Sequence, residues 1–596
     1  MANIKGILKK LLILGLTGAT LLSAAFGCGG GGGGNTPGGG GSTVDNDWSE
    51  GEIDEIELFC NDWEQFNNAK AVRSPIYKKL VKAAGCEIKA VSTALETYYT
   101  QIDLQRTNGN LRDMFIVDGP VDPEMFYNLI RDEEILPISD YVTAETYPHL
   151  YEYLQQYDYM KQNVTYADGK LWWIPVKWQN EKSLYVRRDW IKNLNDKLPN
   201  ILVKEGVIAN ASAATPELLE KHKFTEPTTL DKFYRLARAF TLYDPDNNNK
   251  DDTYGYITET NRDMDSWLHV AYGGAWKMWI DEDGDGNYKN TNTSEPAMLA
   301  TAFLNKMISE GYVSREVVQN TVSNKQDGFS NGKAGMMYAH NWYNVISANM
   351  MASTGLSIAG ARERILIMDP PAGKDGDFGG QGDVEYYRGW CIRNGMSKER
   401  RKACLDLMEY LHSPEGIELV TYGVYGEHWE WKDDIEGGEK ITLVDADANG
   451  FVQALRWTDF AAFASYLTET PFEAEALLTN GDILVERARA SAACMILSDY
   501  PDLYTETMTE YAGTAADFFD TEVLKMMINA TLKSTWTYDE KTWAEDGMTK
   551  VYTVSNAMKE AWSKYVQTYN TTYRGSQMEQ EYNALIKSGT VTKRTA

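Results

Sequence analysis

Short apolar runs interrupted by polar residues predict a series of β-strands along the chain. Ile56 and Leu58 alternate with Glu55 and Glu57, which is the two-residue period of a strand with one buried face. Mostly apolar runs are typical of strands buried on both faces. They occur at 113–120, where the strand runs into a loop, and at 171–175, 183–186, 335–339 and 365–368. The segments between these candidate strands are long enough to hold helices.

Several of those segments have the spacing of amphipathic helices. The apolar residues from Phe233 to Phe240 are spaced at i, i+3, i+4 and i+7, after Thr228 or Thr229 as the candidate N-cap. Helices are also predicted over 123–130 and 397–411, and the spacing beyond Phe451 is mostly helical. Strands that alternate with helices predict an α/β fold.

The composition describes a soluble, strongly acidic globular body. The 596 residues include 58 basic and 86 acidic side chains, which give a formal net charge of −28. A nucleic-acid partner is excluded, because this charge repels a phosphate backbone. Hydrophobic residues make up 43% of the chain, which is enough for a sizeable core and excludes a disordered acidic tail.

The N-terminus has the pattern of an exported lipoprotein. An apolar run from Leu11 to Phe26 follows three lysines, and it is short for a transmembrane helix but typical of a signal peptide. Residues 25–28 resemble the lipobox of bacterial lipoproteins, although Ala25 and Phe26 depart from its usual pattern. The resemblance implies a signal peptide over 1–27, a lipidated Cys28 that anchors the protein to the membrane, and a flexible glycine-rich linker over 28–50. The alternative is a plain signal peptide with an incidental cysteine.

Local motifs give no support to an enzyme. The chain has no G-x-S-x-G elbow, H-E-x-x-H pair, Walker A loop or G-x-G-x-x-G turn, and its six histidines are dispersed. No C-x-x-C pair occurs, and an odd number of cysteines remains beside Cys28, so a zinc site or a disulfide framework is not predicted. A pair of catalytic carboxylates stays open, because sequence spacing does not reveal separation in space.

The order of short segments resembles the sugar-binding, family 1 extracellular solute-binding proteins of ABC transporters. The matching segments are 113–118 (DMFIVD), 136–141 (LPISDY), 166–175 (YADGKLWWIP), 184–190 (LYVRRDW), 227–233 (PTTLDKF), 332–336 (GKAGM) and 413–416 (SPEG). Each segment alone is a weak signal. Their common order along most of the chain carries the resemblance.

This resemblance implies a two-lobe, periplasmic-binding-protein-like fold of type II with a ligand cleft between the lobes. The layout of the family places the first lobe at 51–182 plus 369–430 and the second at 187–364 plus 431–596. It implies a monomer without catalytic activity that captures a carbohydrate, most simply an oligosaccharide, for import by the transmembrane subunits of an ABC permease. The ligand biases closure of the two lobes.

Aromatic and amide residues gather where strands are predicted to end, which is the edge that faces the ligand in open α/β sheets. Sugar rings need flat aromatic plates with polar groups beside them. Three triplets combine both kinds of group: Asn61-Asp62-Trp63, Trp178-Gln179-Asn180 and His340-Asn341-Trp342. The candidate ligand-binding residues are Asn61, Asp62, Trp63, Asp118, Trp178, Gln179, Asn180, Trp276, Asn341, Trp342, Tyr387, Trp390, His428 and Trp429. For any single tryptophan, and for the turn around His428, a purely structural role is the alternative.

The segment from Asp244 to Asp252 has the oxygen spacing of an EF-hand-type calcium loop. Its candidate ligands are Asp244, Asp246, Asn248, the carbonyl oxygen of Lys250, and Asp252. Asn249 stands where glycine is usual, and Gly255 stands where a glutamate would complete the site. The sequence therefore predicts a structural Ca²⁺ and no catalytic cofactor, with an ordinary polar turn as the alternative. A similar segment at 281–287 is interpreted as a hairpin turn.

Three functions remain in competition. The favoured one is a membrane-anchored lipoprotein on the outer face of the cell membrane that binds a carbohydrate for import. The alternatives are a surface enzyme that degrades glycans and a glycan-binding adhesin or sensor that takes no part in transport. Sugar binding without turnover separates the first from the second.

Overall fold

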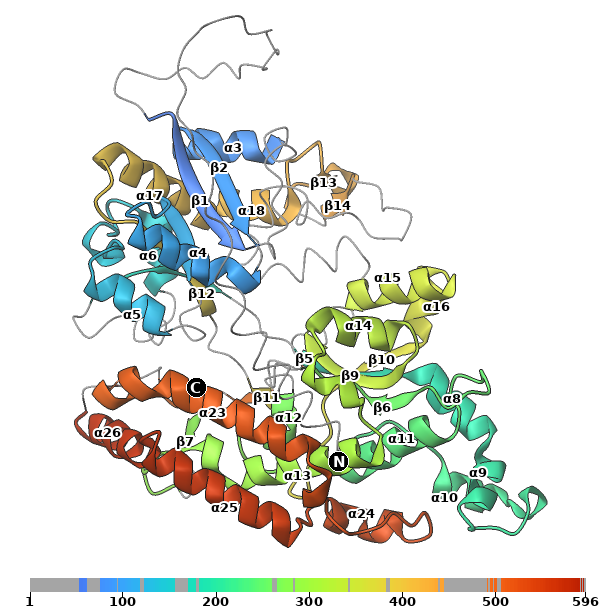
Figure 1. The fold of residues 1–596 in the computed structure, drawn as a ribbon. Helices are drawn as coiled ribbons and strands as arrows, with labels where there is room; N and C mark the ends of the chain where they lie inside the picture. The colour runs from blue at the N-terminus through green and yellow to red at the C-terminus, as the bar shows by residue number, and fades with distance from the viewer. Residues whose placement is uncertain are drawn as a thin grey trace, which may run out of the picture. The chain divides into compact units, whose positions relative to one another are not determined.

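The computed structural model shows an α/β chain whose strands form two main sheets (Figure 1). It describes residues 53–61, 75–93, 95–117, 123–155, 170–177, 182–259, 265–281, 284–340, 343–381, 386–437, 440–443, 490, 494–496, 498–500, 505–589, 591 and 593. The predicted signal peptide, Cys28 and the linker lie outside these residues. Within the described part, no helix combines the length and the apolar character that crossing a membrane requires.

The first sheet has five strands in the order β2-β1-β3-β12-β4. Its strands are β1 (Glu55–Asn61), β2 (Glu87–Thr93), β3 (Met114–Val117), β4 (Ile174–Lys177) and β12 (Tyr386–Ile392). β1 pairs in parallel with β2 and β3, whereas β12 is antiparallel to both β3 and β4. All four residues of β3 are buried, as its uninterrupted apolar run predicts.

Helices from both ends of this lobe's sequence pack around the first sheet. They are α3 (Pro75–Ala84), α4 (Leu95–Thr107), α5 (Pro123–Arg131), α6 (Pro148–Gln155), α17 (Lys398–His412) and α18 (Pro414–Tyr422). α17 contacts α3, α6 and β1, so a helix from the later part of the chain joins three early elements. The predicted helices at 123–130 and 397–411 are confirmed as α5 and α17.

The second sheet has four strands in the order β10-β5-β9-β6. They are β5 (Lys182–Arg187), β6 (Tyr254–Tyr256), β9 (Ala334–His340) and β10 (Ile365–Met368). Alternate residues enter different cores: Leu184 and Val186 join one apolar cluster, whereas Tyr185 between them joins another. The sheet is therefore buried on both faces, because successive side chains of a strand point to opposite sides.

Two helical layers cover the second sheet. Its helices are α8 (Arg188–Asp196), α9 (Leu198–Lys204), α10 (Pro216–His222), α11 (Leu230–Leu242), α12 (Ser266–Ala271), α13 (Glu295–Glu310), α14 (Val322–Ser330), α15 (Tyr343–Thr354) and α16 (Ile358–Glu363). α11 confirms the helix predicted from the Phe233–Phe240 spacing, with Thr229 at its N-cap. The hydroxyl of Thr229 donates to Asp231 at 2.7 Å and does not cap the backbone.

The C-terminal segment consists of four helices that pack with the second sheet's helices. These are α23 (Glu506–Ile528), α24 (Trp543–Val551), α25 (Asn556–Thr571) and α26 (Gly575–Lys587). α23 and α25 contact α13, and their buried side chains continue the apolar cluster that begins on β5 (Figure 1). The helical spacing predicted beyond 451 is confirmed for the described part of that region.

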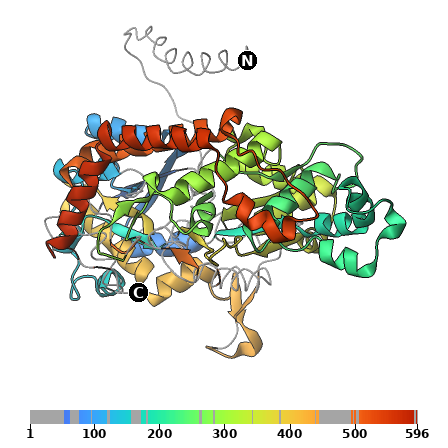
Figure 2. The same ribbon diagram turned by 90° about the horizontal axis from the view of Figure 1, so that it is seen from below.

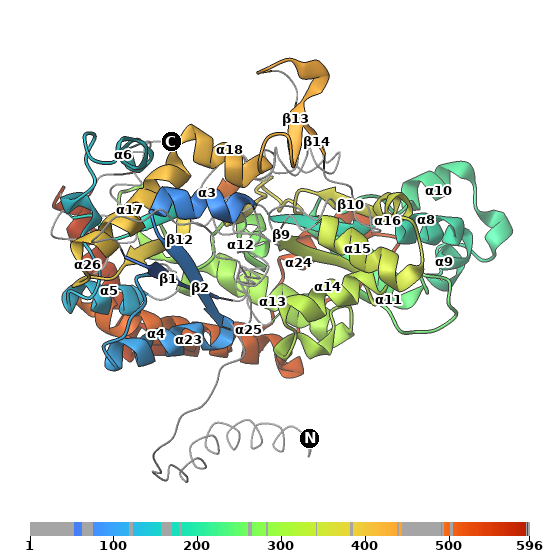
Figure 3. The same ribbon diagram turned by 90° about the horizontal axis from the view of Figure 1, so that it is seen from above.

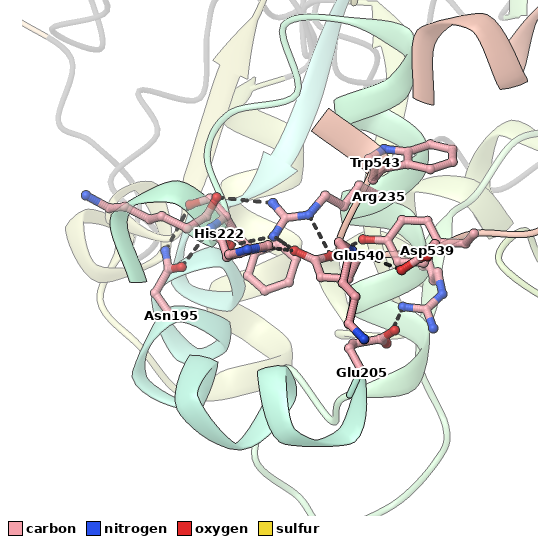
Figure 4. A network of polar contacts seen from close by, with 12 residues as sticks. Asn195, Glu205, His222, Arg235, Asp539, Glu540 and Trp543 are labelled. Carbon is pink, nitrogen blue, oxygen red and sulfur yellow. Dashed lines mark hydrogen bonds and ion pairs between the residues drawn. The ribbon is translucent and has the colours of Figure 1, made fainter. Parts of the chain in front are cut away.

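A buried polar network ties this segment to the second lobe (Figure 4). Glu540 accepts hydrogen bonds from Arg235, at 3.1 and 2.7 Å, and lies 2.8 Å from the ring of His222. Burial raises the pKa of Glu540, but the hydrogen bonds and charge of Arg235 outweigh it and hold that pKa below its usual value. The network therefore stabilises the ionised carboxylate, which is 3% exposed.

The return of the chain to the first sheet comes later than the sequence analysis places it. The expected boundary is residue 369, but Ala372 still forms backbone hydrogen bonds with Thr228 and Leu230 of the second lobe. β11 (Gly380–Gln381) then pairs with β15 (Met495–Ile496), and only β12 rejoins the first sheet. The position of this crossing depends on long-range pairing that the local pattern does not contain.

Two further hairpins complete the described chain. β7 (Trp279–Ile280) pairs with β8 (Lys289–Asn290), and the turn between them confirms the hairpin interpretation of the 281–287 segment. β13 (Trp429–Trp431) pairs with β14 (Lys440–Thr442) after α18. Figures 2 and 3 show β13 and β14 extending outward from α18.

Candidate functional site

The first sheet brings two of the predicted ligand residues, Asn61 and Tyr387, to one edge. β1, β3 and β4 run in the same direction and end at this edge, where the antiparallel β12 begins. Asn61 is the last residue of β1, and Tyr387 is the second residue of β12. Asp62, Trp63, Asp118, Trp178, Gln179 and Asn180 lie outside the described residues, but they follow directly in sequence from the ends of β1, β3 and β4. That these six residues line the same edge stays a prediction.

The second sheet has a corresponding edge that is rich in buried charge. β9 ends at His340 opposite Lys182, the first residue of β5. Asn341 and Trp342 follow His340 in sequence and lie outside the described residues. Tyr185 donates a hydrogen bond to the carbonyl of His340 at 3.0 Å, which fixes the backbone where the predicted binding triplet begins.

Two buried polar pairs support this edge from within the second lobe. Lys325 is fully buried, lies 3.1 Å from the carboxylate of Glu259, and donates to the carbonyl of Tyr338 at 3.1 Å. Asp265 is also fully buried and accepts hydrogen bonds from Tyr256 and Thr258, each at 3.0 Å. Buried charges persist only when they are paired in this way. Together they tie Thr258 and Glu259, which follow β6, to Asp265 and to Tyr338 of β9.

Sequence reasoning missed these buried groups. Glu259 and Lys325 are far apart in the sequence, and nothing in the pattern around either one marks it as buried. The one local signal is a polar T-E-T segment that begins two residues after β6.

Two predicted tryptophans are core residues in this structure. Trp276 is buried and packs against His269 and Phe519, with ring centroids 4.8 and 5.0 Å apart. Trp390 is buried within β12, where it pairs with Ile116 on one side and Ile174 on the other. Both tryptophans therefore have the purely structural role that was the alternative for each of them, because their position in the apolar interior leaves no surface for a ligand.

His428 and Trp429 organise a turn. The Nδ1 atom of His428 accepts from the backbone N–H of Val424 at 2.8 Å, and the indole N–H of Trp429 donates to the carbonyl of Gly423 at 3.1 Å. Gly423 has a φ of +86°, and an added Cβ atom would lie within 2.8 Å of the His428 ring. The glycine is thus required by both its conformation and the close approach of the histidine.

The predicted calcium loop closes on itself through its own side chains. The carboxylate of Asp244 accepts backbone hydrogen bonds from Asn248 and Asn249, at 3.0 and 3.2 Å. The amide nitrogen of Asn248 bridges Asp246 and Asp252, at 2.8 and 3.0 Å. Asn249 has a φ of +60°, so it adopts the conformation for which EF-hand loops use glycine.

The donor chemistry of this loop fits a hard cation such as Ca²⁺. Burial raises the pKa of Asp246, and the nearby negative charges of Asp244 and Asp252 raise it further. A cation would relieve that repulsion, and rotation of the Asn248 amide would turn its oxygen toward the ion. Among the described residues, no group of three or more His, Cys, Asp or Glu side chains is arranged to hold a metal. An ion here would therefore depend on Asn248 and on the carbonyl oxygen of Lys250 as well.

The loop is open to solvent on one side. Asp246 lines a cavity of about 340 Å³ together with Arg187, Asp189 and Arg364. Arg187 forms a two-contact ion pair with Asp189, at 2.8 and 2.6 Å, and its guanidinium stacks over Trp190. Residues 247–252 of the loop are themselves exposed, so an ion would reach the loop directly from solvent.

The described chain forms two lobes, each with its own sheet. Residues 76–426 match the bacterial extracellular solute-binding protein family, and the chain belongs to that family. The predicted two-lobe α/β fold and the resemblance noted in the sequence are both confirmed.

Two Bacillus subtilis (strain 168) proteins are similar to this chain. One is the polygalacturonan/rhamnogalacturonan-binding protein YtcQ, 23% identical over 427 residues, which are 70% of this chain and 75% of that protein. The other is the lipoprotein LipO, 22% identical over 376 residues, which are 61% of this chain and 65% of that protein.

A solved structure shares the fold. It is the S. pneumoniae ABC-transporter substrate-binding protein FusA in complex with kestose, which is 14% identical with a TM-score of 0.58. The alignment covers 90% of this chain and all of FusA. A second structure of FusA is that of an EF-hand mutant in complex with fructo-nystose.

Proposed function

We propose that this protein captures a carbohydrate, most simply an oligosaccharide, outside the cell and delivers it to an ABC permease. The observation that carries the proposal is the family match, which spans strands of both sheets. The names of YtcQ and FusA, which state a polysaccharide and an ABC transporter, support the choice of ligand and partner. Sugar rings offer flat apolar faces, which suit the aromatic residues predicted at the two sheet edges.

The ligand would bind the predicted triplets at those edges. Trp63, Trp178 and Trp342 each stand beside an amide or carboxylate residue in sequence, directly after a strand. A tryptophan can stack on a sugar ring while its neighbours accept or donate hydrogen bonds to the hydroxyl groups. Lobe closure over the sugar would then make the bound state more compact.

Calorimetric titration of residues 43–596 against sugars found by a glycan array tests this proposal. Each of Trp63→Ala, Trp178→Ala and Trp342→Ala should weaken binding about five- to 150-fold, by analogy with the range for stacking on aromatics. Tyr254→Ala is the matched control, because Tyr254 begins β6 at the opposite edge of the second sheet. Near-parental affinity in all three tryptophan variants would contradict the site.

The same titration separates binding from catalysis. Chromatography of the sugar recovered after incubation should show the starting material alone. Release of shorter sugars would favour the alternative of a glycan-degrading enzyme. A sensor would also bind the sugar without cleaving it. Uptake of the sugar by the producing bacterium is therefore measured with and without the gene for this protein.

A structural Ca²⁺ in the Asp244–Asp252 loop is part of the proposal, and the EF-hand named for FusA supports it. Chelation with EDTA should lower the Tm of the parent protein. Asp246→Ala should abolish that response, whereas Asp251→Ala should retain it, because Asp251 is exposed in the same loop but is not a proposed ligand. An identical melting curve with and without EDTA would leave the loop as a polar turn.

Membrane anchoring through Cys28 completes the proposal, and the lipoprotein name of LipO supports it. Cys28→Ser should release the protein from the membrane fraction into the medium or the soluble fraction. A variant that remains with the membranes to the same extent as the parent would contradict lipidation.

A further inference from the structure

The β13–β14 hairpin (residues 423–443) begins with a turn that is held rigidly. Gly426 donates its backbone N–H to the carbonyl of Trp429 at 2.8 Å, and Leu443 donates to the carbonyl of His428 at 2.9 Å. The side chains of His428 and Trp429 reach back to Val424 and Gly423, as described above. A turn with this many internal hydrogen bonds presents its surface side chains in fixed positions.

Three aromatic rings form a cluster along one side of the hairpin. Trp429 is buried, with Tyr425 and Trp431 on either side at centroid distances of 5.2 and 5.0 Å. The rings meet at interplanar angles of 70° and 90°. Perpendicular rings pack well against each other, but they do not make the shared flat plate on which consecutive sugar rings would stack.

The hairpin also exposes large apolar side chains. Tyr425 is 55% exposed, Ile435 62% and Leu443 41%. In the described part of the chain, eight large hydrophobic residues are exposed, and three of them belong to these 21 positions. A concentration of this kind on an outward-extending hairpin is typical of an interaction surface (Figures 2 and 3).

The charge of the hairpin restricts its partner. Between Glu427 and Lys440 the sequence contains six acidic and two basic residues. Glu436 and Asp433 are exposed on the two sides of Ile435. Anionic lipid headgroups and polyuronate sugars would be repelled, whereas an apolar surface with a basic rim would be attracted. The exposed aliphatic side chains of Ile435 and Leu443 suit a protein surface better than a sugar.

We infer that the hairpin is a docking element for a partner protein with an apolar, basic surface. On the proposed function, that partner is a transmembrane subunit of the permease, presenting this surface on its outer face. Ile435 and Tyr425 insert into the apolar part, and Asp433 and Glu436 pair with the basic rim.

Photo-crosslinking in the bacterium that makes the protein tests this inference. A photoreactive amino acid replaces Ile435 in one strain, and in the control strain it replaces Leu104, which is 52% exposed on α4. Mass spectrometry should identify a permease transmembrane subunit in the adduct at 435. The yield at 104 should be at least ~10-fold lower, because a single crosslinker far from the contact captures only chance encounters.

Charge reversal then tests the chemistry of the contact. Asp433→Lys combined with Glu436→Lys should reduce the permease adduct at 435 by about tenfold, since like charges would then face each other. An adduct at 435 with lipid, with a second copy of this chain, or with the same yield as at 104 would overturn the inference. An adduct unchanged by the charge reversal would also overturn it.

A parallel titration keeps this inference separate from the proposed function. Purified Tyr425→Ser/Ile435→Ser protein is compared with the parent and with Leu104→Ser on the glycan array. Parental sugar binding is expected in the double variant, and its loss with an unchanged Tm would make the hairpin a sugar subsite and overturn the docking role. If the parent binds no sugar, the proposed function fails, while the crosslink at 435 still decides whether the hairpin docks on a permease.

Discussion

The two lobes enclose their buried carboxylates to different degrees. In the first lobe, Asp113 is bound by Arg393 and Arg400, and both arginine side chains keep about a third of their surface in solvent, at 29% and 33% exposed. In the second lobe, Glu540 is bound by Arg235 and His222, which are only 15% and 7% exposed. The C-terminal segment makes the difference, because it supplies Glu540 and covers the helices that hold its partners. The added helices bury the ion pair of Glu540, whereas the ion pair of Asp113 stays partly exposed. Losing either partner of the buried pair therefore lowers the free energy of unfolding more.

The largest effect is expected for Glu540→Gln. It removes the charge that Arg235 faces inside the second lobe, and breaking a buried pair in this way costs about 3–5 kcal/mol. Calorimetry of residues 43–596 should show the transition of the second lobe at a lower temperature. Glu560→Gln, an exposed change on α25, is the control and should leave that transition in place. Equal curves for both variants would mean that the network contributes nothing to stability.

Acid should affect the first lobe before the second. Burial lowers the pKa of His412 to about 4, because its ring is enclosed on α17 beside Tyr153. The unfolded chain takes up this proton near pH 6.5, so the contribution of His412 is present above that pH. It is lost as the pH falls from about 6.5 to 4, by up to about 3 kcal/mol.

Glu540 loses its contribution to stability over a lower pH range than His412 does. Its pKa is depressed, so its contribution is present above the usual carboxylate pKa and is lost as the pH falls through the depressed value. Calorimetry from pH 7 to 4 should therefore shift the transition of the first lobe first. His412→Phe keeps a ring beside Tyr153 and should remove that early shift. A first-lobe transition that responds equally in this variant would assign the acid response to other groups.

The smallest effect is expected for Asp113→Asn in the first lobe. The amide still occupies the site, and the two arginines can turn their charge toward water, so the cost should be about 2 kcal/mol. Urea unfolding followed by fluorescence measures this cost against Asp103→Asn, an exposed change on α4. A loss as large as that of Glu540→Gln would remove the contrast between the two lobes.

The strands that the sequence predicts are those whose burial is visible in their own residues. β3, β9 and β10 are continuous apolar runs, and each was expected within a residue or two of its observed bounds. β12 was missed because Arg388 and Gly389 interrupt its apolar pattern, although it holds β3 and β4 together. Its role comes from partners far away in the sequence, which a local period does not record.

The candidate site divides in the same way. The triplets beginning at Asn61 and at Trp178 were chosen because they directly follow strands, whose ends mark the ligand edge in open α/β sheets. They stay predictions, because most of their residues lie outside the described chain. Trp276 and Trp390 were included as aromatic residues near predicted strand ends, and that pattern does not separate an aromatic plate from a core side chain. The Glu259–Lys325 pair joins a loop residue after β6 to a residue of α14. Such a contact forms only in three dimensions, so no sequence motif predicts it.

The position of β12 also sets an order of assembly. It lies between β3 and β4 in the first sheet, yet the chain reaches it only after all four strands of the second sheet have been made. Until β12 arrives, β4 has no neighbour in its sheet, while the second sheet already has every strand it needs. The first lobe must therefore wait for the closure of a long loop, which is the slow kind of contact in folding. A nascent chain that stops short of β12 would carry an open strand edge, which is a site for pairing with other chains.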